Sequence, residues 1–256
     1  MLTAHALTCL LSEARPPAFP FLTLLVSGGH TMAVLVHSLE RFEVVATTLD
    51  DSVGNTFDKF ARELGLPWQS ASGALVEQLA ADATDAAPAK LPRIMLGQPA
   101  FSYAGLKSAA SRAIAASGGA DMSLAHKCAL AHEFQQAAFA PLEDKVVRCV
   151  SARAARGKLS QGWFLSESAI APAAPVTAVV CSGGVASNRY LRDRCVSLLT
   201  SLRTALDQCG RGDIELYFPP PALCVDNAVM IAWAGHLFWD RRTHDMAPHV
   251  LAKWPL

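Results

Sequence analysis

The sequence lacks any excess of charge, because 22 lysines and arginines offset 22 aspartates and glutamates. No global field therefore draws this protein to nucleic acid, and a basic patch for RNA must be local or come from a partner. Charged residues are also few, at 17%, while hydrophobic residues make up 52%. This composition excludes an intrinsically disordered chain and indicates a well-buried core.

The seven cysteines form no CxxC pair, and their number is odd. A zinc ribbon and a disulfide scaffold are therefore not expected, and a reducing compartment is favoured. No apolar run reaches the ~18 residues that a membrane-spanning helix needs. Residues 1–13 have neither the basic start and cleavage site of a signal peptide nor the arginines of a transit peptide.

The hydrophobic pattern predicts a helix over residues 2–13, followed by three strands with short connections over 21–26, 31–38 and 42–49. Further predicted elements are helices over 55–64 and 73–81, a loop over 84–100, mainly helix over 105–156, a surface loop over 157–175, a strand over 176–184, a helix over 188–207 capped by Ser187, a strand over 214–218 and a helix over 226–240. The order predicts an α/β fold that resembles the ribonuclease-H-like lobe of actin-like ATPases. Those proteins hold a nucleotide between two lobes, and only one is apparent here.

Two Ser-Gly-Gly turns, at residues 27–29 and 182–184, each follow a buried strand. Bare glycine N–H groups in such turns can point at phosphate oxygens. One turn alone is equally well explained as a hairpin, and the second by close strand–helix packing. Together they favour the two faces of a nucleotide cleft.

Several acids near the first turn have both a functional and a plain interpretation. Asp58 is a candidate for ribose hydroxyls, whereas Asp50 and Asp51 suit solvated acids at a helix start. Glu77 lies one helical turn after Gly73 and is equally a surface acid.

His5 and Asp226 are a weaker pair of candidates. An Asp that opens a helix is most often a cap, and a lone His is seldom a ligand. Their imidazole and carboxylate together suit Fe or Zn, but two ligands are too few to define a site.

Eight stretches, in order along the whole chain, resemble the transfer RNA threonylcarbamoyladenosine transferases, an actin-like family once called O-sialoglycoprotein endopeptidase. They are HALT (5–8), LLVSGGHT (24–31), LDDSVGNTFDKFARELGL (49–66), SGALVE (72–77), FSYAGLKSA (101–109), VVCSGGVASNRYLR (179–192), CVDNAVMIAWAG (224–235) and KWPL (253–256).

The resemblance implies a substrate site that binds threonylcarbamoyl-AMP. Its residues here are Leu25, Val26, Ser27, Gly28 and Gly29 on the phosphate side, Asp58 at the ribose, and Gly73, Glu77 and Asn188. We expect a single groove in which Asp58, Gly73, Glu77 and Asn188 surround Gly28, Gly29 and Gly184. The resemblance also implies one divalent metal ion, Fe or Zn, with His5 and Asp226 as ligands. No catalytic base is assigned; His30 is a candidate by position alone, and a structural role is favoured for it.

The sequence departs from the family at two places. Met1 stands where the first histidine of an HxxxH pair is expected, and the PGGP motif is replaced by Ala71, Ser72, Gly73 and Ala74. The family's first lobe has no counterpart here. We therefore expect one truncated domain over 1–256, with 1–18 a remnant of the first lobe or connecting helix and 19–256 the second lobe, and poor metal binding and activity.

The implied reaction is acyl transfer to the exocyclic amine of adenosine 37 in tRNAs that read codons beginning with A, with release of AMP. Its partners are tRNA, threonylcarbamoyl-AMP, the enzyme that makes it upstream, and optionally a second copy of the chain, with no membrane. HALT, the lost PGGP prolines and the Trp254–Leu256 end are similar to the mitochondrial branch. A mitochondrial location is therefore expected, with the cytoplasm as the alternative.

Three other functions stay open on the residues. A sugar or acetate kinase of the same superfold needs a catalytic Asp in its first lobe, and a metalloprotease needs an HExxH motif, which is absent. A non-catalytic nucleotide-binding fragment is separated from the enzymes by a binding assay with an AMP-like ligand.

Overall fold

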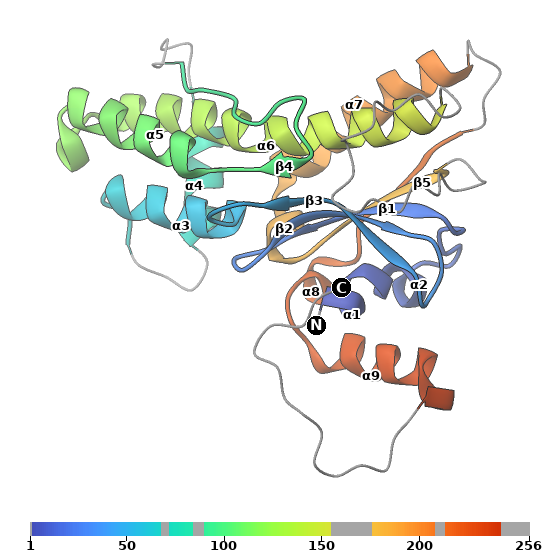
Figure 1. Ribbon diagram of the computed structural model, residues 1–256. Coiled ribbons are helices and arrows are strands. Elements are labelled where there is room, and N and C mark those ends of the chain that lie inside the picture. The colour runs from blue at the N-terminus through green and yellow to red at the C-terminus, as the bar shows by residue number, and fades with distance from the viewer. Residues whose placement is uncertain (1, 68–71, 84–89, 155–175, 208–212, 242–256) are drawn as a thin grey trace.

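The computed structural model describes residues 2–67, 72–83, 90–154, 176–207 and 213–241 (Figure 1). Its centre is a sheet with the strand order β4-β3-β2-β1-β5-β6. The strands are β1 (Phe21–Val26), β2 (Thr31–Val36), β3 (Phe42–Thr48), β4 (Ala100–Phe101), β5 (Ala178–Ser182) and β6 (Glu215–Tyr217). The first three form the predicted antiparallel meander, and β5 and β6 extend it in parallel with β1. This arrangement confirms the predicted α/β, actin-like fold class.

Strand β1 is the middle of the molecule, because it is covered on both faces. Leu22, Leu24 and Val26 face the larger apolar core, and Phe21 and Leu25 face the smaller one. A strand that is buried on both sides favours apolar residues on both faces, which explains why Thr23 is the one polar residue in the run FLTLLV.

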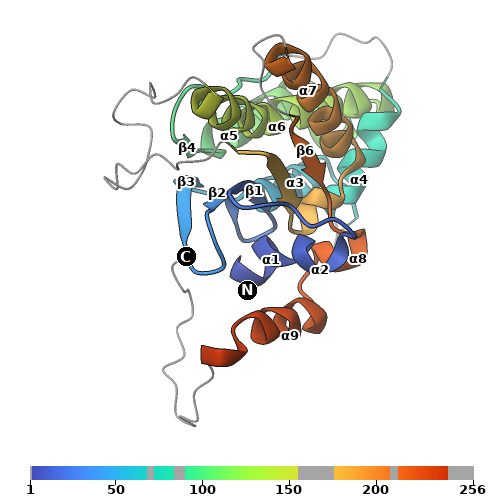
Figure 2. The same ribbon diagram turned by 90° about the vertical axis from the view of Figure 1, so that its right-hand side faces the viewer.

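Two layers of helices cover the sheet (Figure 2). The larger core lies under α3 (Val53–Glu63), α4 (Ser72–Ala81), α5 (Ala104–Ala116), α6 (Leu124–Ala154) and α7 (Arg189–Asp207). The smaller core lies under α1 (Leu2–Leu7) and α2 (Cys9–Ser12), and α9 (Ala228–Leu237) packs against α1. No helix among the described residues has the length and apolarity to cross a bilayer.

The second half of the chain differs from the sequence prediction in its short elements. The strand β5 is followed by a single 3-10 turn, η2 (Gly184–Ser187), and Asn188 rather than Ser187 caps α7, because its Oδ1 accepts the Leu191 N–H at 2.9 Å. The helix predicted over 226–240 begins at Ala228, after the separate turn α8 (Pro221–Cys224), and ends before η3 (Trp239–Arg241). The loop predicted over 157–175 lies outside the described residues.

Candidate functional site

The two glycine turns leave the sheet side by side. Strands β1 and β5 are parallel neighbours, with Leu25 opposite Ser182. Both strands therefore end, and both glycine turns begin, at the same edge of the sheet. In α/β proteins, ligands bind in the crevice beyond the carboxyl ends of such strands. Gly183 adopts φ 101°, and a Cβ there would collide with the carbonyl oxygen of Val26. The second turn can therefore lie against the first only because residue 183 is glycine.

The first turn is closed by its own serine. The Ser27 Oγ accepts the His30 N–H at 3.0 Å, and the Ser27 N–H donates to the His30 carbonyl at 2.8 Å. Gly28 and Gly29 are exposed, and a Cβ on either would meet no atom within 4 Å. The serine hydroxyl is thus used for the turn, and it also accepts the Gly29 N–H at 3.3 Å, so of the two glycine N–H groups only that of Gly28 is left unused by this hydroxyl.

The N-terminus of α3 holds this turn in place. The Ser52 Oγ donates to the Gly28 carbonyl at 2.5 Å, and the Gly54 N–H donates to the Ser27 carbonyl at 3.2 Å. A Cβ on Gly54 would lie 2.6 Å from that carbonyl oxygen, so a larger residue would push the helix away. The turn and the helix therefore form one rigid unit.

Asp58, Gly73 and Glu77 join α3, α4 and α7. The half-buried Asp58 carboxylate accepts a hydrogen bond from the Gly73 N–H; burial raises its pKa, and this bond lowers it by less. The Glu77 Oε1 accepts the Arg189 N–H at 2.8 Å, at the first turn of α7, where the helix dipole stabilises an anion. Glu77 is therefore not a plain surface acid.

Asn188 is only 8% exposed, and the rest of the protein uses both ends of its amide. Its Nδ2 donates to the Gln135 Oε1 at 3.0 Å, and its Oδ1 caps α7. The contacts among α3, α4, α7 and η2 bring Asp58, Gly73 and Glu77 into one region with the residues around Asn188. A groove shared with Gly28, Gly29 and Gly184 stays a prediction.

The two candidate metal ligands are in direct contact. The His5 Nε2 lies 2.8 Å from the Asp226 Oδ1; the His5 side chain is buried, whereas that of Asp226 is 69% exposed. Asp226 is not the cap of α9, because Asn227 fills that role through a 2.9 Å hydrogen bond from the Met230 N–H. The carboxylate is thus aimed at His5 rather than at its own helix.

The side chains of this pair are of the kind that binds a metal ion, but two ligands are too few to hold one. Imidazole and carboxylate suit Zn or Fe, and the buried His5 Nδ1 has no hydrogen-bond partner among the described residues. Within that part of the chain, no group of three His, Cys, Asp or Glu side chains could hold an ion. Met1, at the expected histidine position, lies outside the described residues.

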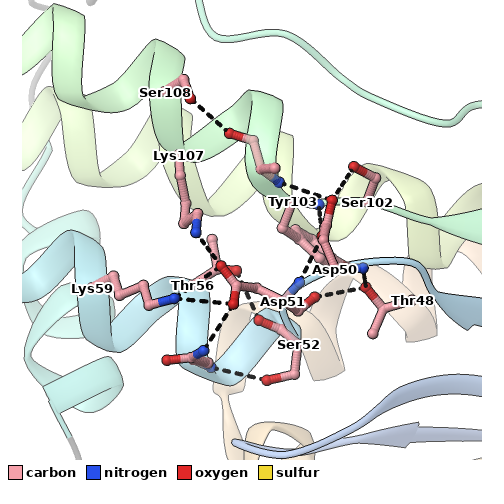
Figure 3. Close-up of polar contacts among 12 residues, drawn as sticks. Thr48, Asp50, Asp51, Ser52, Thr56, Lys59, Ser102, Tyr103, Lys107 and Ser108 are labelled. Carbon is pink, nitrogen blue, oxygen red and sulfur yellow. Dashed lines mark hydrogen bonds and ion pairs between the residues drawn. The ribbon is translucent and has the colours of Figure 1, made fainter.

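Asp50 is exposed, as the sequence-based interpretation of a solvated acid predicted, but its carboxylate also has partners within the protein. Its carboxylate accepts hydrogen bonds from the Ser102 Oγ at 2.5 Å and from the Tyr103 N–H at 2.8 Å (Figure 3). Burial opposes ionisation, but these bonds outweigh it and lower the pKa of Asp50. Asp50 thus ties the end of β3 to the start of α5.

The same interpretation is wrong for Asp51, which is ion-paired with Lys59 at 3.0 Å and with Lys107. The hydrogen bond from Lys107 is the largest cause of the lowered pKa of Asp51. Figure 3 shows both lysines, from α3 and α5, converging on this carboxylate. The Lys59 and Lys107 positions in the sequence carried no indication that they would meet, because 48 residues separate them along the chain.

Comparisons with known proteins agree over most of the chain. A family model described as TsaD, tRNA N6-adenosine threonylcarbamoyltransferase, matches residues 1–233. The probable mitochondrial tRNA N6-adenosine threonylcarbamoyltransferase of Arabidopsis thaliana is 35% identical over 243 residues, which cover 91% of this chain and 45% of the plant protein.

Bacterial relatives align over the full chain. The tRNA N6-adenosine threonylcarbamoyltransferases of Rhizobium etli (strain CIAT 652) and Sphingopyxis alaskensis are 37% and 39% identical, and each match covers 100% of this chain and 63% of the relative. The chain therefore spans less than two thirds of the length of these curated relatives.

Proposed function

Because this chain belongs to the TsaD family of tRNA N6-adenosine threonylcarbamoyltransferases, we propose that it takes part in threonylcarbamoyl transfer to tRNA. The donor is threonylcarbamoyl-AMP, and the acceptor is the exocyclic amine of adenosine 37 in tRNAs that read codons beginning with A. The proposal rests on the pair of glycine turns at the carboxyl ends of β1 and β5. The backbones of the two turns lie in close contact, at the edge of the sheet where ligands bind in α/β proteins.

The first turn, Leu25 to Gly29, takes the phosphate side of the adenylate. Leu25 and Val26 are buried in β1, so they contribute backbone rather than side chain. The exposed backbone of Gly28 and Gly29 offers N–H groups to the phosphate, that of Gly29 in exchange for its 3.3 Å bond to the Ser27 Oγ, and steadies the negative charge that grows on it as AMP leaves. The bonds from α3 hold this backbone in place before the substrate arrives.

Asp58 accepts hydrogen bonds from the ribose hydroxyls, next to the Gly73 backbone and Glu77. Burial raises the pKa of this half-buried carboxylate, and its two oxygens have more acceptor sites than the hydrogen bond from the Gly73 N–H fills, which leaves acceptor capacity for a ligand. Glu77 and Asn188 hold the first turn of α7 in position, and we assign them to the substrate site through that turn.

One divalent ion, Fe or Zn, is proposed at His5 and Asp226, with further ligands from outside this pair. When bound, it would polarise the threonylcarbamoyl carbonyl as a Lewis acid. The direct contact between the His5 Nε2 and the Asp226 Oδ1 supports the assignment, because the two donors already converge on one point.

The proposed substrates are tRNA and threonylcarbamoyl-AMP, and an enzyme that makes threonylcarbamoyl-AMP acts upstream. A homodimer is proposed as well. The name of the plant relative favours a mitochondrial location, with the cytoplasm as the alternative that the bacterial relatives support. We also propose that residues 1–256 form one domain, in which 1–18 belong to the first lobe or the connecting helix and 19–256 are the second lobe. The packing of α1 in the same core as β1 and β5 supports a single domain.

The test separates nucleotide binding from transfer. AMP binding is measured by calorimetry on residues 1–256, and threonylcarbamoyl transfer is measured on a chimera that adds the part of the Rhizobium etli relative without a counterpart here. The control tRNA carries guanosine at position 37. AMP binding with transfer by the chimera supports the proposal. AMP binding without transfer favours a non-catalytic nucleotide-binding protein, and absence of AMP binding overturns both.

A further inference from the structure

Arg192, on the second turn of α7, contacts three segments that lie apart in the sequence. Its Nε donates to the Ala186 carbonyl at 2.7 Å, and its Nη2 donates to the Pro219 carbonyl at 3.2 Å. The same Nη2 lies 3.8 Å from the Cys224 Sγ, and the guanidinium covers the Phe218 ring at 4.8 Å. These partners are all neutral. Hydrogen bonds and the contact with the Phe218 ring, rather than an ion pair, therefore explain the position of the Arg192 guanidinium.

Two of these segments belong to the two halves of the proposed site. Ala186 lies in η2, directly after the Gly183–Gly184 turn, whereas Cys224 ends α8, two residues before Asp226. They also touch each other: η2 packs against α8, and a Cβ on Gly184 would lie 3.8 Å from the Val225 side chain. Arg192 thus bonds to the backbone of η2 at Ala186 and to the segment before Asp226 through the Pro219 carbonyl and the Cys224 Sγ.

The thiol of Cys224 strengthens this connection. Its Sγ donates to the Pro219 carbonyl at 3.3 Å, and a hydrogen bond with Ser187 reaches it from η2. The segment before Asp226 is therefore fixed through Arg192 and Cys224 together.

We propose that Arg192 is a positioning residue that couples the glycine turn after β5 to the segment that carries Asp226. A ligand that orders Gly183–Ser187 then also orders Pro219–Asp226, and this coupling is reciprocal for any ion held by Asp226. The identity of the two ligands rests on the proposed function. The guanidinium is needed because its planar fork serves two carbonyl oxygens at once, which a lysine ammonium on a flexible stem does poorly.

The experiment follows hydrogen exchange of peptides from 183–188 and 219–228 in residues 1–256, with and without AMP. The variants are Arg192→Met and Arg192→Lys, and the matched control is Arg194→Met. Arg194 lies on the same helix and forms an exposed pair with Glu143 at 2.7 Å, away from both segments. In the wild-type protein and the control, AMP is expected to slow exchange in both peptides about threefold to tenfold, roughly the effect of one hydrogen bond.

In both Arg192 variants, AMP is expected to slow exchange in 183–188 alone. Slowing of both peptides in Arg192→Met, or of the first peptide alone in the wild-type protein, overturns the coupling. If AMP does not bind the wild-type protein, the proposed function fails separately. Exchange without AMP then decides the role of Arg192: both peptides must exchange faster in Arg192→Lys than in Arg194→Met, and equal rates sink the inference.

Discussion

The two regions of the proposed site, the glycine turns after β1 and β5 and the His5–Asp226 pair, differ in how firmly described contacts hold them. Around the glycine turns, the backbone is held by bonds from Ser52 and Gly54 and by helices that the Asp50 and Asp51 contacts tie together. Around His5 and Asp226, one contact joins two side chains, and the neighbouring helix α9 buries only Met230. Within the described residues, the first region is held by several bonds to its backbone, whereas the second shows two side chains that could bind an ion and a helix, α9, that is mostly exposed. The comparison teaches that nucleotide binding and catalysis should separate in this chain.

The largest expected effect is at the second region. Residues 1–256 should bind less than one equivalent of Fe or Zn and should not modify tRNA, because His5 and Asp226 supply only two ligands. The exposed Val229, Ile231 and Trp239 should also promote self-association. Elemental analysis, light scattering and a transfer assay measure these effects. A stoichiometric ion together with turnover would show that this lobe is sufficient.

In the first region, Gly183→Ala should be the most damaging substitution. It adds both a Cβ that collides with the Val26 carbonyl and a strained positive φ, with a loss of about 2–5 kcal/mol in stability. AMP binding should disappear with it. The control is Gly118→Ala, which also has a positive φ of 99° but lies in the left-handed helical region at ψ 15°, whereas Gly183 has ψ 163°, and which has open space around the new Cβ. Equal unfolding free energies for the two variants would mean that the close approach of the turns is unimportant.

Asp58→Ala should weaken binding of an adenylate analogue by about 1.5–3 kcal/mol, because a carboxylate forms charge-assisted bonds with ribose hydroxyls. Binding should also weaken as the pH falls through the raised pKa of Asp58, since the protonated acid accepts less well. Calorimetry at several pH values measures both effects. Asp121→Ala, at an exposed acid in η1 (Gly119–Asp121), is the control. Affinities that match the wild-type value would make Asp58 a structural acid.

Asp51→Asn should destabilise the protein by about 1–2 kcal/mol at neutral pH, because it leaves Lys59 and Lys107 without their shared partner. The folded-state pKa of Asp51 is lowered, so this stability is present above its unfolded pKa of about 4 and is lost as the pH falls through the folded value. Denaturant unfolding of both proteins from pH 7 to pH 3 measures the difference. A gap that does not narrow in acid would contradict the ion pair.

The elements that the sequence predicted well are those with a clear period or an unbroken apolar run. The meander, β5, α3 and α4 are of this kind. The strand β4 and the turn α8 were missed because two or four residues carry no period. The cap of α7 was assigned to Ser187 because Ser and Asn are equally good caps, and only the 3-10 turn moves the start of the helix by one residue.

The site was predictable in its motifs but not in its connections. The glycine turns could be identified because glycines after buried strands have a known chemistry. Asp58 was a candidate from its place in the helix after β3 and from the family resemblance, and its role at a ribose stays a prediction. The long-range contacts of Asp50, Asp51 and Arg192 could not be found, since Tyr103, Lys107 and Pro219 lie 53, 56 and 27 residues away from them and meet them only in the folded chain.

The smallest expected effect on stability is at Asp226, in the second of the two regions compared above. Asp226→Asn should change stability by less than about 1 kcal/mol, because its side chain is 69% exposed and solvent screens its pairing with His5. Asn227→Ala, one residue on, should cost about 1 kcal/mol, because it removes the cap that accepts the Met230 N–H. Thermal unfolding of the two variants measures this order. A larger loss at Asp226 would mean that the carboxylate holds the fold together. A smaller loss there, as expected, leaves it free to serve a ligand without weakening α9.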